Sequence, residues 1–430
     1  MSAGERALSD AAEAAAVDAR LVSLGRVRGM GVFLVLLGVV TLMAFALGVT
    51  GGARATFLLS TPPSIDLSPL VMSVRPVAIA CALVCGGLGI VLLVRLRTQG
   101  SYLIFSAGFC AFLWAFLAWA ARGNTLNFVQ MLAETMVAAT PLVYGSLSGI
   151  LCERSGVVNI AIEGQFLAGA FLGAMIGSAT GNLWLGVVSG AVAGALFGAL
   201  LAFLALRYGA DQIIVGVVIV AFCTGLTNFL TAQVLTPDQT TLNSPSTFSP
   251  FAVPLLDKIP IAGPVLFDQN VFFYGAFALL VLVHVTLFHT RWGLRVRAVG
   301  EHPRAAQSVG IHVLSVRYRN VILGGVVAGI GGASFTIGSI GEFSAQMTAG
   351  LGYVALAAMI FGRWRPFGAL GAALLFGFAV SLQSFLAVLS VGIPSPFLSM
   401  APYVITIAVV SGLVGRVRPP AADGVPYSLE

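Results

Sequence analysis

The chain has 430 residues, of which 58% are hydrophobic and only 9% are charged, and its formal net charge is +6. Because an ordinary soluble domain carries about 25% charged residues, this composition excludes a soluble globular protein and indicates a polytopic membrane protein. The basic residues stand in short clusters at the ends of apolar segments, which is typical of membrane topology. We therefore expect contact with membrane lipid and no nucleic-acid partner.

Apolar runs long enough to cross about 30 Å of hydrocarbon recur along the chain. We expect spans near residues 30–50, 75–94, 102–121, 128–150, 166–180, 183–206, 212–231, 270–289, 320–340, 349–362, 366–388 and 399–415. Basic clusters end every second span on one side, and the positive-inside rule makes that side cytoplasmic. The sequence thus predicts an all-α transmembrane helical bundle of about twelve spans, one or two of them re-entrant, with both termini in the cytoplasm.

One glycine pattern predicts a close contact between helices. Gly186, Gly190, Gly194 and Gly198 recur every four residues along one span. Small residues at this spacing let two backbones approach, so we expect another helix to pack on this ridge. No Gly-Lys-Ser or Gly-Lys-Thr follows any glycine cluster, so we expect the chain to hydrolyse no nucleotide by a loop of its own.

The segment from Glu153 to Gln165 carries two carboxylates and an arginine between two apolar stretches. A charged side chain at the bilayer centre costs about 2.5–3.5 kcal/mol on insertion scales, so such groups persist mainly where they line a cavity or a solvated mouth. Gly156 and Gly164 bracket an apolar turn and allow non-helical backbone, which membranes tolerate where it is buried in protein or lines a polar path. The segment is therefore predicted to be a functional site.

Two interpretations of these polar side chains stay open. A helix through Asn159 and Glu163 would place both on one face, where with Gln165 they would offer hydrogen bonds to ribose hydroxyls or base edges. Alternatively, Asn159, Glu163 and Arg154 satisfy one another and pin a re-entrant turn. Glu134, inside a span, and Asn228, near a span end, are weaker candidates for the solute pathway.

Residues 291–320 form the longest basic stretch on the cytoplasmic side. Pro303 suits a first helical turn and Gly310 suits a helix end, so a short helix is predicted between them. Such a helix on the membrane face has the shape needed to dock into a cleft on a soluble partner. The alternative is a basic loop that fixes topology and contacts anionic lipid.

No metal site and no catalytic group is expected. The histidines His284, His289, His302 and His312 have no metal-ligand spacing, and no grouping of Ser, His and Asp is visible. The five cysteines lie in or beside apolar stretches and are interpreted as packing residues.

The two motifs together resemble those of a known transporter family. Glu153 to Gln165 is similar to the hallmark of permeases that serve nucleoside and simple-sugar ATP-binding-cassette importers, related to the branched-chain amino acid and ribose permeases. The run from Gly293 to Gly300, followed by Pro303, Ala305, Ala306 and Gly310, looks like that family's coupling region. One departure is that Arg304 stands where the general importer pattern Glu-Ala-Ala has glutamate.

The resemblance spans about residues 128–416 and implies a domain order. A cytoplasmic tail (1–29) and an extension with three spans (30–127) precede a permease domain (128–416), and a second cytoplasmic tail (417–430) follows. The residues implied to couple the permease to its ATPase are Arg295, Arg297, Gly300, Pro303, Arg304, Ala305, Ala306 and Gly310.

What the resemblance implies is a type II importer in a bacterial cytoplasmic membrane. Two permease subunits, often different, would form one pathway for a nucleoside or related sugar. Cytoplasmic ATPases would use the ATP, so this chain would bind no cofactor, and an external solute-binding lipoprotein would deliver the solute. The alternative is an ion-coupled secondary transporter whose intramembrane carboxylates carry a proton or sodium ion.

Overall fold

The computed structural model of the chain describes residues 24–50, 52–62, 64–94, 100–389, 396–397, 400 and 418–427. These residues divide into two compact units. The first unit lies within Met1–Thr61, Asp66–Val129 and Ser384–Gly415, and the second lies within Pro62–Ile65, Gln130–Gln383 and Arg416–Glu430.

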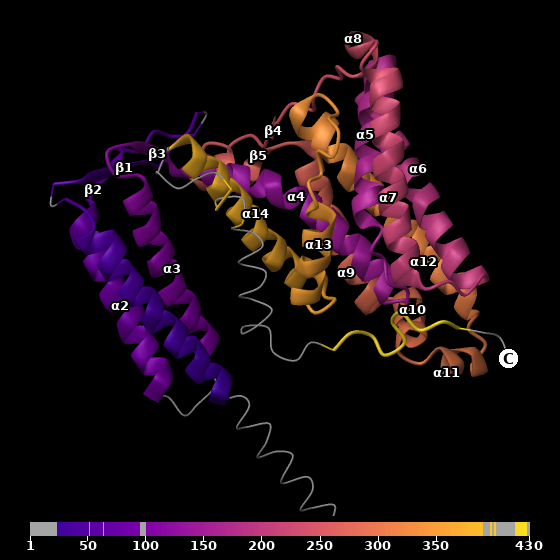
Figure 1. Cartoon of the computed structure of the whole chain (residues 1–430), viewed down its shortest axis with the longest axis horizontal. Coiled ribbons are helices and arrows are strands. Elements are labelled where there is room, and N and C mark those ends of the chain that lie inside the picture. Colours follow the sequence, from indigo (N-terminus) through magenta and orange to yellow (C-terminus); the bar gives the residue numbers. More distant parts are fainter. Residues whose placement is uncertain are drawn as a thin grey trace, which may run out of the picture. The chain divides into compact units, whose positions relative to one another are not determined.

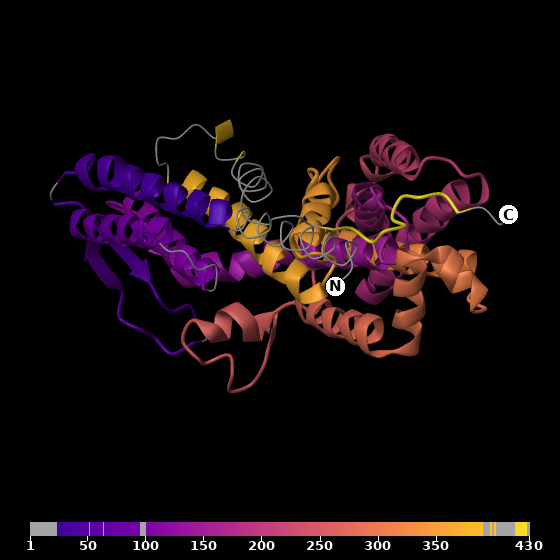
Figure 2. The ribbon, with the colours of Figure 1, turned by 90° about the horizontal axis from the view of Figure 1, so that it is seen from below.

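The first unit contains three long apolar helices and a small sheet. The helix Leu24–Leu47, which ends in the π-helical turn Thr41–Leu47, runs beside α2 (Val74–Val94) and α3 (Ser101–Ala120) (Figure 1, Figure 2). The sheet has the order β2-β1-β3, in which β1 (Arg54–Leu58) pairs antiparallel with β2 (Leu70–Ser73) and parallel with β3 (Thr125–Asn127). The all-α prediction missed these strands because segments of three to five residues are too short for a periodic pattern.

The second unit is built from helices of very different length. They are α4 (Phe128–Glu153), α5 (Ile162–Thr180), α6 (Leu183–Ala202), α7 (Gln212–Leu230), α8 (Gln239–Leu242), α9 (Val271–His289), α10 (Arg291–Glu301), α11 (Pro303–Ser308), α12 (Val313–Phe335), α13 (Leu351–Phe361) and α14 (Pro366–Val388). Short π-helical turns follow three of them, at Phe203–Arg207, Thr231–Leu235 and Thr336–Ile340, and a fourth lies at Gly263–Phe267. The strands β4 (Phe251–Ala252) and β5 (Asp268–Gln269) form one antiparallel pair.

Within the described residues, ten helices are long and apolar enough to cross a membrane. They match ten of the twelve predicted spans. The predicted span 349–362 corresponds to α13, whose 11 residues cover only about 17 Å and are too short to cross. The predicted span 399–415 lies, apart from Met400, outside the described residues.

Polar residues at span ends fix where several of these helices begin. The side chain of Asn182 accepts hydrogen bonds from the backbone N–H groups of Trp184 (3.0 Å) and Leu185 (3.4 Å) at the start of α6. Asp211 does the same for Ile213 and Ile214 at the start of α7. Because the first N–H groups of a helix have no partner within it, such caps separate one apolar run from the next.

The predicted glycine ridge is confirmed as a helix contact. A Cβ added at Gly186 would stand 2.8 Å from the carbonyl oxygen of Gly173 on α5, and one at Gly194 would stand 2.7 Å from Cα of Gly329 on α12. At Gly198 the nearest atom would be the carbonyl oxygen of Val321, at 2.9 Å. Both α5 and α12 therefore pack on α6 at backbone distance, as small-residue ridges permit.

The candidate site lies among the most buried helices of the second unit. In their most apolar stretches, α4 is 83% buried and α5 is 72% buried, whereas α7 is only 28% buried. The outward side of α6 and α7 presents large apolar side chains such as Val192, Leu196 and Phe222, as expected for surfaces in contact with lipid or another membrane subunit. The polar segment after α4 is thus enclosed by protein.

Candidate functional site

The polar segment is a break between two helices. Helix α4 ends at Glu153 and α5 begins at Ile162, so residues 154–161 are non-helical. Gly156 has a φ of +88°, a conformation that favours glycine, and a Cβ there would stand 2.7 Å from Nη2 of Arg317. The expected break is present, but Gly164 lies inside α5 and does not bracket it. A single helix through Asn159 and Glu163 is therefore wrong, because the chain turns between them.

Asn159 lies in a buried polar cluster with Gln165. Its Nδ2 donates to Oε1 of Gln165 (3.2 Å) and to Oγ of Ser148 on α4 (3.4 Å), and all three side chains are fully buried. Asn159 Oδ1 and Gln165 Nε2 have no hydrogen-bond partner among the described residues. A buried amide with unmet capacity is costly unless a water molecule or another polar group supplies the missing bond.

Glu163 bonds to a different segment. Its carboxylate accepts hydrogen bonds from Oγ1 of Thr348 (2.6 Å) and from the backbone N–H groups of Gly350 (2.8 Å) and Gly352 (2.6 Å). Glu163 also lies in the first turn of α5, where the helix dipole favours a negative charge. A Cβ at Gly352 would stand 2.7 Å from Glu163 Oε2, so glycine there gives the carboxylate room. This carboxylate ties α5 to the start of α13.

The other pathway candidates lie in separate surroundings. Glu134 is half-buried on α4 and accepts a hydrogen bond from Nε2 of Gln130 (3.3 Å). Asn228 is half-buried near the end of α7, and its Oδ1 has no partner within the described part of the chain. Of the five candidates, the structure joins only Asn159 and Gln165 by a direct hydrogen bond.

The Glu153–Arg154 end of the motif is hydrogen-bonded to the turn between α13 and α14. Nε1 of Trp364 donates to the Glu153 carboxylate (2.6 Å), and Nε and Nη2 of Arg154 both donate to the carbonyl oxygen of Trp364 (3.1 Å each). Burial lowers the pKa of Arg154, and the carboxylate of Glu301 opposes that shift. Sequence reasoning missed Trp364 and Thr348, because they lie about 200 residues away along the chain.

The predicted short helix is present as α11, with Pro303 in its first turn and Gly310 at a φ of +84° beyond its end. The longer α10 was not predicted. Its glycines and β-branched valines have low helix propensity, and the helix forms because Val296 and Val299 are buried against neighbouring helices.

The structure shows which side of α11 is exposed. Ala306 is only 3% exposed and packs against Val299 and Val313, whereas Arg304 and Ala305 are exposed. Among the other predicted coupling residues, Gly300 is buried and Arg297 is half-buried with its guanidinium 5.2 Å from the Phe288 ring. We define the coupling face as the exposed Arg295, Arg304, Ala305, Gln307, Val309 and Gly310.

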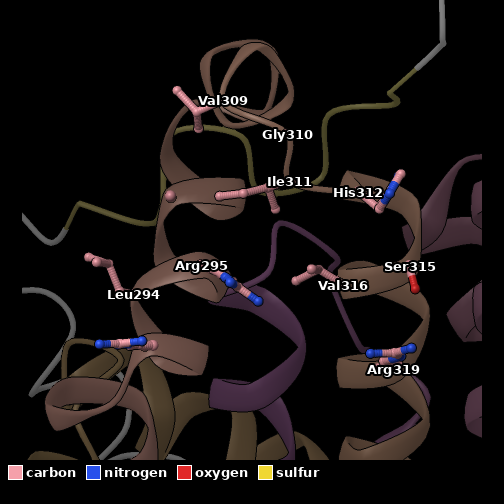
Figure 3. A pocket seen from close by; sticks show the side chains of 11 residues that line it. Leu294, Arg295, Val309, Gly310, Ile311, His312, Ser315, Val316 and Arg319 are labelled. Atoms are coloured by element: carbon pink, nitrogen blue, oxygen red, sulfur yellow. The ribbon is translucent and has the colours of Figure 1, made fainter.

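A basic pocket of about 750 Å³ opens beside the coupling face, between α10 and the start of α12. Figure 3 shows Arg295 and Val316 projecting into it from opposite sides, with Ile311 between the two helices and Arg319 further along α12. Arg291 and His312 also line it, and of the described residues that line it none is acidic. The pocket therefore suits an acidic group that carries some apolar surface.

No group of three or more His, Cys, Asp or Glu side chains that would hold a metal ion is found in the described residues.

The family model described as the permease component of branched-chain amino acid transport systems matches residues 131–415. The chain belongs to this permease family. As a permease subunit it is not an enzyme, and in such transporters ATP hydrolysis belongs to separate subunits.

Known members of the permease family match over most of their length. The chain is 39% identical over 316 residues to the guanosine ABC transporter permease protein NupQ of Bacillus subtilis, covering 70% of this chain and 98% of the relative. It is 38% identical over 320 residues to the nucleoside ABC transporter permease protein NupC of Lactococcus lactis, covering 71% and 98%. The putative glucose ABC transporter permease protein TsgC13 of Haloferax volcanii is 33% identical over 304 residues, covering 66% and 92%. No solved structure matches.

Proposed function

We propose that this chain is a permease subunit of an ATP-binding-cassette importer that carries nucleosides across the cytoplasmic membrane of a bacterium. The observation that carries the proposal is the identity of 39% and 38% to permeases named for guanosine and nucleoside transport, over 98% of each relative. The match to a putative glucose permease is weaker, at 33%. A nucleoside is therefore the solute to test first and glucose the second.

The coupling face and its pocket are proposed to receive the partner ATPase. Arg295, Arg304 and Arg319 are exposed within or beside them, and no carboxylate among the described residues lines the pocket. The face thus fits an acidic surface on the partner, and attraction between the two would weaken in salt. ATP and its metal ion would be held by the ATPase, and this chain would bind no cofactor.

The solute path is proposed to pass the polar residues of α4, α5 and α7 and of the break between α4 and α5. Its support is the cost of burying Asn159 in the break before α5 and Glu163 and Gln165 in α5 itself. The polar atoms of Asn159, Gln165 and Asn228 that lack a partner among the described residues add to it. In this structure the first three side chains are buried, so the proposal requires another conformation in which they reach solute. Release of Glu163 from residues 348–352 is the step that would open the path.

The remaining assembly is proposed from the family. A second, different permease would complete the pathway, an external lipoprotein would deliver the nucleoside, and both termini of this chain would lie in the cytoplasm. Closure of the ATPases would push on α11, and tilting of the spans would expose the path to alternate sides of the membrane.

Uptake of radiolabelled guanosine into vesicles tests the function. We expect uptake to require both the partner ATPase and ATP, and to persist in the presence of an ionophore that abolishes ion gradients. Radiolabelled glucose under the same conditions tests the weaker match. Uptake that survives loss of the ATPase but collapses with the ionophore would instead establish an ion-coupled carrier.

A further inference from the structure

The segment 418–427 returns to the coupling region, where it passes beside α10 and α11 (Figure 1). The backbone N–H of Ala422 donates to the carbonyl oxygen of Gly300 at the end of α10 (2.8 Å), and that of Ala421 donates to Oε2 of Glu301 (3.2 Å). We name this segment the coupling strap. Two bonds thus hold the strap to the helix that leads into α11.

A buried arginine from α12 forms the second attachment of the coupling strap. Arg317 is fully buried, and its Nη1 and Nη2 donate to the carbonyl oxygens of Val425 (3.0 Å) and Ala422 (3.4 Å). The negative charge of Asp423 acts on the same guanidinium. A buried guanidinium without partners is strongly unfavourable, and the strap supplies the acceptors for Nη1 and Nη2 of Arg317.

The third attachment is the turn that ends α4. A Cβ at Gly156 would stand 3.0 Å from the carbonyl oxygen of Ala422, so the strap lies directly against this turn. The carboxyl group of Asp423 in the strap faces that of Glu153 at the end of α4. Only a residue without a side chain fits between the strap and the break in the functional segment.

The strap also reaches the inner side of α11. Tyr427 packs with the buried cluster of Val299, Ala306 and Val313, and it lines a second pocket of about 420 Å³ together with Gln307. Ala306 is the one residue of α11 that is buried. Tyr427 therefore contacts the apolar cluster that packs α11 against α10 and α12.

We infer that the coupling strap transmits movement of α11 to the membrane-spanning helices of the importer. Arg317 is a positioning residue that ties the strap to α12. The inference rests on the proposed coupling of α11 to an ATPase. A helix of six residues has little rigidity of its own, so a push on α11 would be absorbed locally without support. The strap braces α10 and α11 against α4 and α12, so a displacement of α11 passes to the helices that surround Asn159.

The test compares two neighbouring alanines of the strap in the reconstituted importer. Ala422 is 6% exposed, so Ala422→Trp forces the strap away from Gly300 and Gly156. Ala421 is exposed, so Ala421→Trp adds the same side chain without that effect and serves as the matched control. A third variant, Arg317→Met, removes the buried guanidinium together with its bonds to the strap, so no buried charge is left without a partner. The readouts are the amount of assembled complex, the ATP hydrolysed and the guanosine transported per ATP.

We expect Ala422→Trp and Arg317→Met to assemble and to hydrolyse ATP, while guanosine transported per ATP falls about tenfold, a typical coupling factor between two sites. Ala421→Trp should behave as the wild type. An unchanged ratio in both Ala422→Trp and Arg317→Met would overturn the inference, and so would loss of assembled complex, which would make the strap merely structural. Absence of ATP-driven uptake by the wild type would instead count against the proposed function.

Discussion

The site of Glu163 and the coupling face differ in whether their charged groups have partners within the chain. Glu163 is buried, and its carboxylate accepts three hydrogen bonds from residues 348–352. On the coupling face, Arg295 and Arg304 are exposed, and no described acidic residue lines the pocket beside them. A charge that is fully satisfied within the chain contributes to its stability, whereas unpaired charges at an open pocket are available to a partner. Substitutions in the two regions should therefore affect different measurements.

The largest effect is expected from Glu163→Ala. It leaves three donors without an acceptor, at a cost of about 1–3 kcal/mol for each. We expect a marked fall in the thermal midpoint of the purified chain, and a smaller fall for Glu163→Gln, which keeps one acceptor. A normal thermal midpoint combined with lost guanosine uptake would contradict this expectation, because the Glu163 carboxylate would then act in transport and not in stabilising the fold.

A second pair of variants separates the two sides of α11. Ala306→Glu buries a carboxylate in the cluster with Val299 and Val313, and should lower the thermal midpoint by destabilising α10 to α12. Ala305→Glu places the same charge on the exposed side, so the thermal midpoint should remain that of the wild type. The coupling of ATP hydrolysis to uptake should weaken. Equal midpoints for the two variants would contradict the orientation of α11.

The basic pocket is tested by reversing its charge. Arg295→Glu with Arg319→Glu should reduce the ATPase that copurifies with the chain by about tenfold, and added salt should reduce binding to the wild type. Arg207→Glu, an exposed arginine that does not line the pocket, is the control. If both proteins retained the ATPase equally, the partner would dock elsewhere.

The smallest effect concerns Asp423, which lies outside the spans. Burial raises its pKa from 3.8 to about 6, and this outweighs the lowering effect of Glu153 and Arg317, which face it. Because the folded chain then binds the proton more tightly than the unfolded chain, this contribution to stability is complete below the unfolded pKa and is lost as pH rises through about 6.

We accordingly expect the thermal midpoint of the wild type, relative to Asp423→Asn, to rise by about 2 °C between about pH 8 and about pH 5. Asparagine cannot titrate, so the variant removes this contribution together with the effect of Asp423 on the neighbouring Glu153, and leaves the pH effects of more distant groups in place. Parallel pH profiles of the two proteins would show that Asp423 has no raised pKa.

The two regions differ in how much of their structure the sequence alone predicts. The spans, the glycine ridge and α11 followed from apolar run length, small-residue spacing and the Pro303 and Gly310 boundaries, which are local signals. The partners of Glu163 did not, because Thr348 and Gly352 are ordinary residues until the fold brings them to α5. The same holds for the inward direction of Ala306, which is set by packing between α10 and α12. Arg317 carried a usable signal, since an arginine in an apolar helix is costly without a partner.

The packing of α5, α6 and α12 also bears on how the permease can change over evolution. At Gly169, Gly194 and Gly329, a single added carbon would collide with a carbonyl group of a neighbouring helix. At Gly225 on α7 the same carbon would meet nothing within 4 Å. We therefore expect very few substitutions to be tolerated at the three glycine contacts, and many to be tolerated on the outward side of α7. A library that seeks new solute preferences should keep those glycines constant and place its diversity elsewhere.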